Sequence, residues 1–318
     1  MENKQYRIGI DLGGTNIKAG VVNVSNEIVA TARRKTLVNR PWQEIVADMA
    51  AAAREAVQQA GITLEDCASL GVGSPGTVNA KTGIVVYSNN FPGWENIPLG
   101  ETLGKDLGLP VYLSNDANCA ALGEFVAGAA KNADSTVLLT LGTGVGGGVV
   151  FDGKVFEGGP GGAELGHTTL VVDGILCTCG RKGCIESYCS ATALIREAKA
   201  AALRHPDSKL AAMCEGNVEN MDGRIPFEAA RAGDNTAQQV VEEYIHMLGE
   251  GIVNMVNIFR PEIVLLSGGI CGEGRYLTDP LNAFVRTHAF AGERIAIPPV
   301  ERAMLGNDAG IIGAANLR

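Results

Sequence analysis

Residues 8–22, IGIDLGGTNIKAGVV, decide the fold of this chain. Two apolar runs flank a Gly-Gly-Thr turn, and this pattern predicts two strands joined by a tight turn that carries few side chains. Residues 137–151, VLLTLGTGVGGGVVF, repeat the pattern in the second half of the chain. The repetition predicts a duplicated lobe, with a nucleotide bound between the two copies.

Helices and strands alternate through the rest of the chain, which is typical of an α/β protein. Apolar residues at helical spacing predict helices over 41–60, 117–130, 191–204 and 234–259. Short apolar runs predict strands over 70–72, 111–113 and 261–267.

The composition indicates a globular protein of two domains, because the chain has 318 residues and 46% of them are hydrophobic. The net charge of −9 gives no basic surface for nucleic acid or for an anionic membrane. The polar N-terminus resembles no export signal, and no apolar run approaches the ~20 residues that span a bilayer. We therefore expect a cytoplasmic protein whose eight cysteines are thiols or metal ligands.

The first glycine turn suits an approaching phosphate, because Gly13, Gly14 and Thr15 offer bare backbone N–H groups and a hydroxyl. Asp11 precedes this turn, where a carboxylate could orient Mg²⁺ or its water. Residues 142–147 match G-x-G-x-x-G, but a strand and not a helix is predicted after them, which excludes the dinucleotide fingerprint. Ser267-Gly268-Gly269 follows a predicted buried strand, where a planar base could lie against the backbone, although this signal alone is weak and favours a plain turn.

Three cysteines lie close together in residues 177–184, CTCGRKGC, with His167 ten residues before them. Three thiolates and one imidazole form a closed tetrahedral set that suits structural zinc. A disulfide is disfavoured by the odd number of thiols and by a reducing compartment. The spacing leaves open whether the fourth ligand of Cys177, Cys179 and Cys184 is His167 or Cys189.

Residues 114–118, SNDAN, follow a predicted strand and open a predicted helix. Asn115 or Asp116 could simply cap that helix. Asp116 could instead act as a general base, since a carboxylate at a strand end can accept a proton from a hydroxyl and the helix dipole favours its charged form. Glu164, His167 and Glu186 flank the cysteines, so a bound zinc would hold them as a polar wall for a polyol.

These motifs resemble the ROK family (repressor, open reading frame, kinase) and, within it, the bacterial ATP-dependent glucokinases. The resemblance runs from DLGGTNIK at residues 11–18 to LGNDAG at residues 305–310. The motif C-x-C-G-x-x-G-C-x-E over residues 177–186, preceded by E-x-G-H over residues 164–167, is highly specific for this family.

The resemblance implies two actin-like (ribonuclease H-like) lobes, an Mg²⁺ requirement, a homodimer, and transfer of a phosphoryl group from MgATP to the 6-hydroxyl of glucose. Asp116 matches the family's catalytic base. His167 matches a zinc ligand beside Cys177, Cys179 and Cys184. The matched sugar ligands are Gly76, Asn90, Asn115, Asp116, Glu164, His167 and Glu186. The matched nucleotide ligands are Asp11, Gly13, Gly14, Thr15, Thr143, Gly144, Gly268 and Gly269.

We expect an N-terminal lobe of residues 1–117, to which residues 306–318 return, and a C-terminal lobe of residues 118–305 that carries the zinc motif. Mannose, fructose, allose, N-acetylglucosamine and N-acetylmannosamine are alternative substrates, because pocket shape decides among them. Polyphosphate is an alternative donor. A sugar-sensing regulator is disfavoured, because only ten residues precede Asp11 and the chain is acidic.

Overall fold

In the computed structural model, which describes residues 4–318, the predicted hairpin forms strands β1 (Tyr6–Leu12) and β2 (Asn16–Asn23). The two strands pair antiparallel, and the Gly13 N–H closes their turn on the Asn16 carbonyl at 3.0 Å. The second glycine motif likewise forms two neighbouring strands, β9 (Ser135–Leu141) and β10 (Val145–Phe151). Both strand-turn-strand predictions are confirmed, and a strand, not a helix, follows residues 142–147.

The chain divides into two units, and it passes between them four times. The first unit comprises the residues up to Thr136, Gly148–Ala163 and Ala303–Arg318. The second comprises Val137–Gly147 and Glu164–Arg302. The expected lobe boundary at residues 117 and 118 falls inside the first unit, because the helix that begins there packs on the C-terminal helix of the same unit.

The main sheet of the first unit has the order β3-β2-β1-β4-β8. It is completed by β3 (Ile28–Lys35), β4 (Cys67–Ser74) and β8 (Val111–Asn115). Strands β1, β4 and β8 are parallel, with Asp11 opposite Gly73 and Ser74 opposite Asn115. Because the carboxyl ends of parallel strands meet at one edge, Asp11 and Asn115 lie at the same edge of this sheet, two strand spacings or ~10 Å apart.

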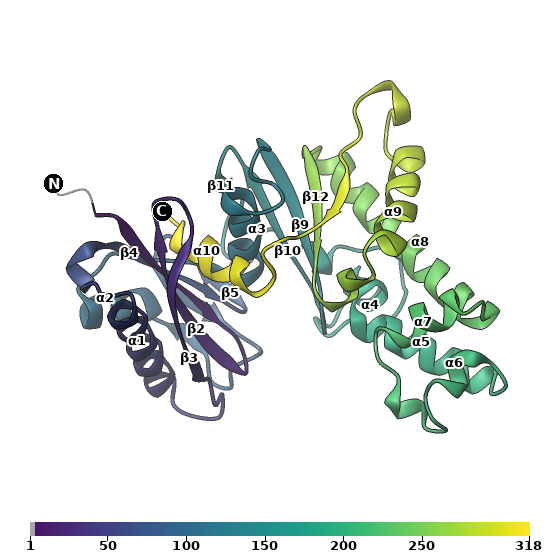
Figure 1. Ribbon diagram of the computed structural model, residues 1–318, viewed down its shortest axis with the longest axis horizontal. Helices are drawn as coiled ribbons and strands as arrows, with labels where there is room; N and C mark the ends of the chain where they lie inside the picture. Colours follow the sequence, from purple (N-terminus) through teal and green to yellow (C-terminus); the bar gives the residue numbers. More distant parts are fainter. Residues whose placement is uncertain (1–3) are drawn as a thin grey trace. The chain divides into compact units, whose positions relative to one another are not determined.

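Helices cover both faces of this sheet (Figure 1). The apolar side chains of β1 pack with α1 (Trp42–Gln59) and α2 (Leu99–Leu107) in one buried core. The opposite face carries α3 (Asp116–Ala127) and α10 (Ala309–Ala315). Here the backbones touch, since a Cβ at Gly71 would lie 1.7 Å from the Ala314 carbonyl oxygen, so only glycine permits this packing.

The remaining strands form two further sheets. A small sheet in the first unit has the order β5-β6-β7, with β5 (Thr77–Asn79), β6 (Ile84–Tyr87) and β7 (Glu95–Ile97). The sheet that contains β9 and β10 has the order β11-β10-β9-β12-β13, with β11 (Lys154–Val155), β12 (Ile263–Ser267) and β13 (Val300–Arg302).

The second unit holds most of the helices. They are α4 (Glu186–Cys189), α5 (Ala191–Arg204), α6 (Lys209–Ala212), α7 (Ile225–Arg231), α8 (Asn235–Phe259) and α9 (Arg275–His288). Side-chain caps explain where the two long predicted helices begin: Ser190 accepts from the Ala193 N–H before α5, and Asp234 from the Ala237 N–H before α8. No helix of residues 4–318 combines the length and apolar character needed to cross a bilayer.

Candidate functional site

The first glycine turn leaves backbone donors available. Gly14 and Thr15 are exposed, and no hydrogen bond among the described residues uses the N–H of either one. The Lys18 ammonium lies 3.2 Å from the Asp11 carboxylate, so a positive charge and a negative charge stand beside these donors. Free N–H groups next to a lysine and a carboxylate suit a phosphate and its cation.

At the end of β8 the structure shows which of residues 115 and 116 caps helix α3. The Asn115 side chain is the N-cap of α3, because its Oδ1 accepts from the Ala117 N–H at 2.8 Å. Its Nδ2 donates to the Gly76 carbonyl at 3.1 Å, which brings Gly76 to this strand end. Asn115 is therefore the N-cap, and Asp116, which is exposed in the first turn, accepts from the same Ala117 N–H through its own Oδ1 at 2.8 Å.

Glu157, which no sequence pattern indicated, bonds to residues on both sides of Asp116. Glu157 accepts hydrogen bonds from the Ser114 hydroxyl and, at 3.4 Å, from the Asn118 amide. Glu157 lies in an irregular segment forty residues away in the chain, so no local pattern indicates the contact. It ties the residues that flank Asp116 to a second segment of the first unit.

Asn90 stays apart from this group in the hydrogen-bond network. It is exposed, and no hydrogen bond of the described residues links it to Gly76, Asn115 or Asp116. The loop is held by Phe91 and Trp94, which are buried and stacked with ring centroids 4.6 Å apart.

The cysteine motif of the second unit gathers one set of possible metal ligands. The donor atoms of His167, Cys177, Cys179 and Cys184 all lie within 4.8 Å of one another. The Cys179 and Cys184 sulfurs are 3.6 Å apart, close to the ~3.8 Å edge of a tetrahedron with Zn–S bonds of ~2.3 Å. The donor set and its spacing thus fit zinc, and all eight cysteines are free.

Cys189 is not among these donors, although the spacing allowed it as the fourth ligand. It lies at the end of α4, and burial raises the pKa of its thiol, which disfavours the thiolate that a metal needs. The Cys179 thiol differs, because a hydrogen bond from the Arg181 backbone lowers its pKa.

Glu186 connects this motif to the second glycine turn. Its Oε1 accepts from the Thr178 hydroxyl at 2.7 Å, and its Oε2 accepts from the Val145 N–H at 3.1 Å. A Cβ at Gly144 would lie 2.3 Å from Oε2, so glycine there lets the carboxylate reach the backbone. Both oxygens of Glu186 are thus engaged within the protein.

The Glu164 carboxylate, unlike that of Glu186, is not engaged in a hydrogen bond among the described residues. The residue is exposed. Partial burial raises the pKa of this carboxyl, His167 opposes that shift, and Glu186 adds to it. Both residues therefore act electrostatically on Glu164, and the polar wall formed by the three residues stays a prediction.

The Gly268-Gly269 turn also meets the second glycine turn. Gly268 follows β12 with a φ of 105°, and a Cβ there would lie 2.2 Å from the Leu141 carbonyl oxygen. Leu141 ends β9 and directly precedes Gly142-Thr143-Gly144, and the Thr143 carbonyl accepts from the Thr192 hydroxyl at 2.8 Å. Two segments more than a hundred residues apart in the chain therefore form adjoining backbone surfaces.

Comparison with known proteins supplies the context for this geometry. The ROK family profile matches residues 7–318. A glucokinase from Thermotoga maritima is 39% identical over 316 residues, which cover 98% of this chain and 96% of that protein.

Two solved structures resemble the chain over its whole length. A ROK family glucokinase from Streptomyces griseus, in complex with glucose and AMPPNP, is 36% identical with a TM-score of 0.80, covering 98% of both chains. A ROK hexokinase from Thermus thermophilus is 33% identical with a TM-score of 0.81, covering 98% of this chain and 97% of the other. These likenesses confirm the predicted fold class, α/β with two actin-like lobes.

Proposed function

The chain belongs to the ROK family, and we propose that it is an ATP-dependent glucokinase, which converts glucose and MgATP to glucose 6-phosphate and ADP. The observation that carries this proposal is the full-length likeness to glucokinases, one of them bound to glucose and a nucleotide. The chain is thus a hexokinase-type phosphotransferase.

Asp116 is the general base in this proposal. Its carboxylate accepts the proton of the 6-hydroxyl while that oxygen bonds to the γ-phosphorus and the bond from phosphorus to the ADP oxygen breaks. The proton then passes to solvent. The exposed position of Asp116 in the first turn of α3, directly after the N-cap Asn115, supports this role.

The nucleotide would be held by backbone. We assign the phosphates to Gly13, Gly14 and Thr15 and to Thr143 and Gly144, and the adenosine to Gly268 and Gly269. Mg²⁺, when bound, neutralises the phosphate charge, and Asp11 would hold it or its water. The unused N–H groups of Gly14 and Thr15 support the first of these assignments.

The sugar would be recognised by Gly76, Asn90, Asn115, Asp116, Glu164, His167 and Glu186. Zinc would be held by His167, Cys177, Cys179 and Cys184, and its chemistry here is structural, since four protein ligands leave no open position. Metal ligation through one nitrogen of His167 leaves a proton on the other, which can donate to a sugar hydroxyl.

A panel of hexoses and N-acetylhexosamines, assayed with ATP and with polyphosphate, tests the proposed function. We expect the highest kcat/KM for glucose with ATP, and one ADP formed per glucose 6-phosphate. A higher kcat/KM for mannose, fructose, allose or an N-acetylated sugar would reassign the substrate, and activity restricted to polyphosphate would reassign the donor.

Replacing Glu164 by Ala is expected to raise the KM for glucose and to leave the KM for ATP within about twofold. Among the described residues its carboxylate has no hydrogen-bond partner, and we assign it a sugar hydroxyl as ligand. That hydroxyl, left unpaired, costs ~1–3 kcal/mol, about 5- to 150-fold. The control is Glu242→Ala, which removes an exposed carboxylate on α8. Equal changes in both Michaelis constants would contradict the role of Glu164 in sugar binding.

We further propose a homodimer in a reducing, cytoplasmic compartment. The eight free thiols suit that compartment, and light scattering of the purified protein tests the oligomeric state.

A further inference from the structure

Thr36, which directly follows β3, contacts both ends of the first glycine turn. The residue is fully buried. Its hydroxyl donates to the Gly13 carbonyl at 2.6 Å, and its backbone N–H donates to the Thr15 carbonyl at 3.1 Å. A single residue thus bonds to the carbonyl on either side of Gly14.

The first of these bonds determines where a backbone donor points. The Gly13 carbonyl and the Gly14 N–H belong to one planar trans peptide, so they point in opposite directions. When the Thr36 hydroxyl holds the carbonyl, the Gly14 N–H is directed away from Thr36. Gly14 is exposed, and no hydrogen bond among the described residues uses this N–H, so it is available to a ligand.

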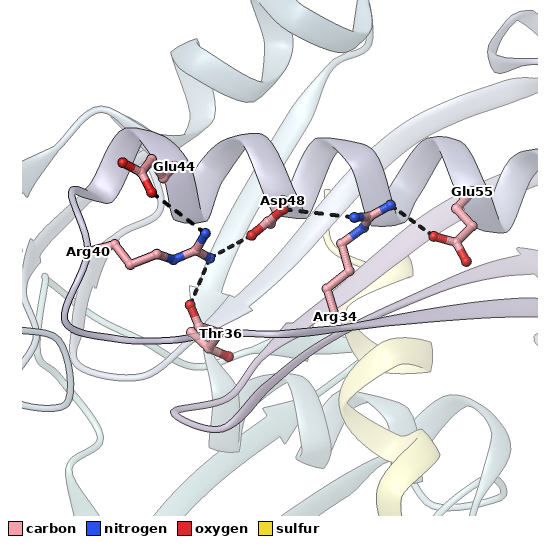
Figure 2. A network of polar contacts seen from close by, with 6 residues as sticks. All are labelled: Arg34, Thr36, Arg40, Glu44, Asp48 and Glu55. Atoms are coloured by element: carbon pink, nitrogen blue, oxygen red, sulfur yellow. Dashed lines mark hydrogen bonds and ion pairs between the residues drawn. The ribbon is translucent and has the colours of Figure 1, made fainter.

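Thr36 is itself held in place by a network of charged side chains (Figure 2). The Arg40 guanidinium donates to the Thr36 carbonyl at 2.9 Å and to the Asp48 carboxylate at 2.6 Å. Asp48 also lies 3.9 Å from Arg34, which donates to Glu55 at 3.1 Å. Asp48 and Glu55 are on α1 and Arg34 is on β3, so the network ties the end of β3 to the helix that covers the sheet.

From this geometry we infer that Thr36 is a positioning residue for the phosphate of the donor nucleotide. It fixes the peptide between Gly13 and Gly14 so that the Gly14 N–H is already oriented when the nucleotide arrives, and Arg40 keeps Thr36 in place. A donor oriented in advance costs no reorganisation on binding. The inference rests on the proposed function, and it predicts an effect on ATP and not on the sugar.

Three variants separate the hydroxyl from its surroundings. Thr36→Val has the same shape and lacks the hydroxyl, Thr36→Ser keeps it, and Thr31→Val makes the same change at an exposed position of β3. We expect Thr36→Val to raise the KM for ATP and the Kd for MgAMPPNP roughly tenfold, since the Gly13 carbonyl loses its partner. The KM for glucose should stay within about twofold, and Thr36→Ser and Thr31→Val should keep the wild-type values.

Arg40→Gln provides a second test, which does not require the buried threonine to change. It removes the charge that pairs with Asp48, so we expect a weaker effect of the same kind, about two- to fivefold in the KM for ATP and none in the KM for glucose. If Thr36→Val does not fold, this variant decides the matter.

Unchanged nucleotide affinity in Thr36→Val, or an equal loss in Thr36→Ser, would overturn the inference. If the wild-type protein phosphorylates glucose and Thr36→Val keeps its KM for ATP, the inference fails alone. If the wild-type protein binds MgAMPPNP but phosphorylates no sugar, the proposed function fails, and the Kd values of the variants still test the inference.

Discussion

Replacing Asp116 by Asn is expected to lower kcat for glucose phosphorylation by ~10²–10⁴-fold, the usual contribution of a positioned general base. The amide has the shape of the carboxylate but cannot accept the proton of the 6-hydroxyl. The fold should be unaffected, because Asn115 caps α3 and the Oδ1 of an Asn at position 116 can still accept from the Ala117 N–H, as Asp116 does. Steady-state assays with saturating glucose and ATP measure the loss, and thermal unfolding checks the fold.

Asp207→Asn makes the same change at an exposed position outside the proposed site, and it should leave kcat unchanged. Near-normal turnover of Asp116→Asn at neutral pH would refute the assignment of Asp116 as the base. A lost activity accompanied by a large fall in Tm would instead indicate a structural role.

The second large effect concerns zinc. We expect one zinc per chain, held by His167, Cys177, Cys179 and Cys184, and elemental analysis of protein purified without added metal measures it. Cys179→Ser should abolish the bound zinc, lower the Tm, and raise the KM for glucose about 10- to 100-fold, the usual cost of disturbing groups that orient a site.

The reason lies in the bonds that connect the metal loop to the sugar residues. Thr178, between two of the cysteines, donates to Glu186, and His167 is itself one of the four proposed ligands. Loss of the ion frees this loop, so Glu186 and His167 lose their positions together. The KM for ATP should rise less, although Glu186 also accepts from the Val145 N–H beside Gly144.

Cys67→Ser is the matched control, since Cys67 is buried in the first unit and outside the ligand group. It should retain one zinc per chain and the wild-type KM for glucose. If Cys179→Ser lost its zinc and kept the wild-type KM for glucose, the metal would serve stability alone, and the proposed link between zinc and sugar recognition would be wrong.

Local patterns were sufficient for the helices and strands that the sequence predicted, but not for short elements such as β5, β6 and β7. The helix predicted over 191–204 is α5 to the residue, and the helix predicted over 41–60 is α1 with one residue fewer at each end. These helices can be predicted from the spacing of apolar residues, from capping side chains and from glycines that end a helix, all of which act within a few residues. The division into units could not be read in this way, because α3 joins the first unit through its contact with α10, which follows it by almost two hundred residues.

The spacing of residues in the sequence did not identify the fourth of the proposed metal ligands. The sequence identified three cysteines and offered His167 or Cys189 as the fourth donor. Only the folded chain distinguishes them, because α4 carries the Cys189 thiol into the buried interior while the short 3-10 helix Leu165–His167 places the imidazole beside Cys177.

By itself the sequence determined the longest helices, the two glycine turns, the candidate metal donors and the family, because each of these depends on residues that lie close together in the chain. The tertiary structure decided which groups meet. It placed Thr36 under the Gly13–Gly14 peptide, Glu157 beside the strand end that carries Asp116, and Glu186 against the backbone next to Gly144. Such contacts join residues 23 to 43 positions apart through hydrogen bonds whose partners depend on how strands and loops pack, and no local periodicity records that packing.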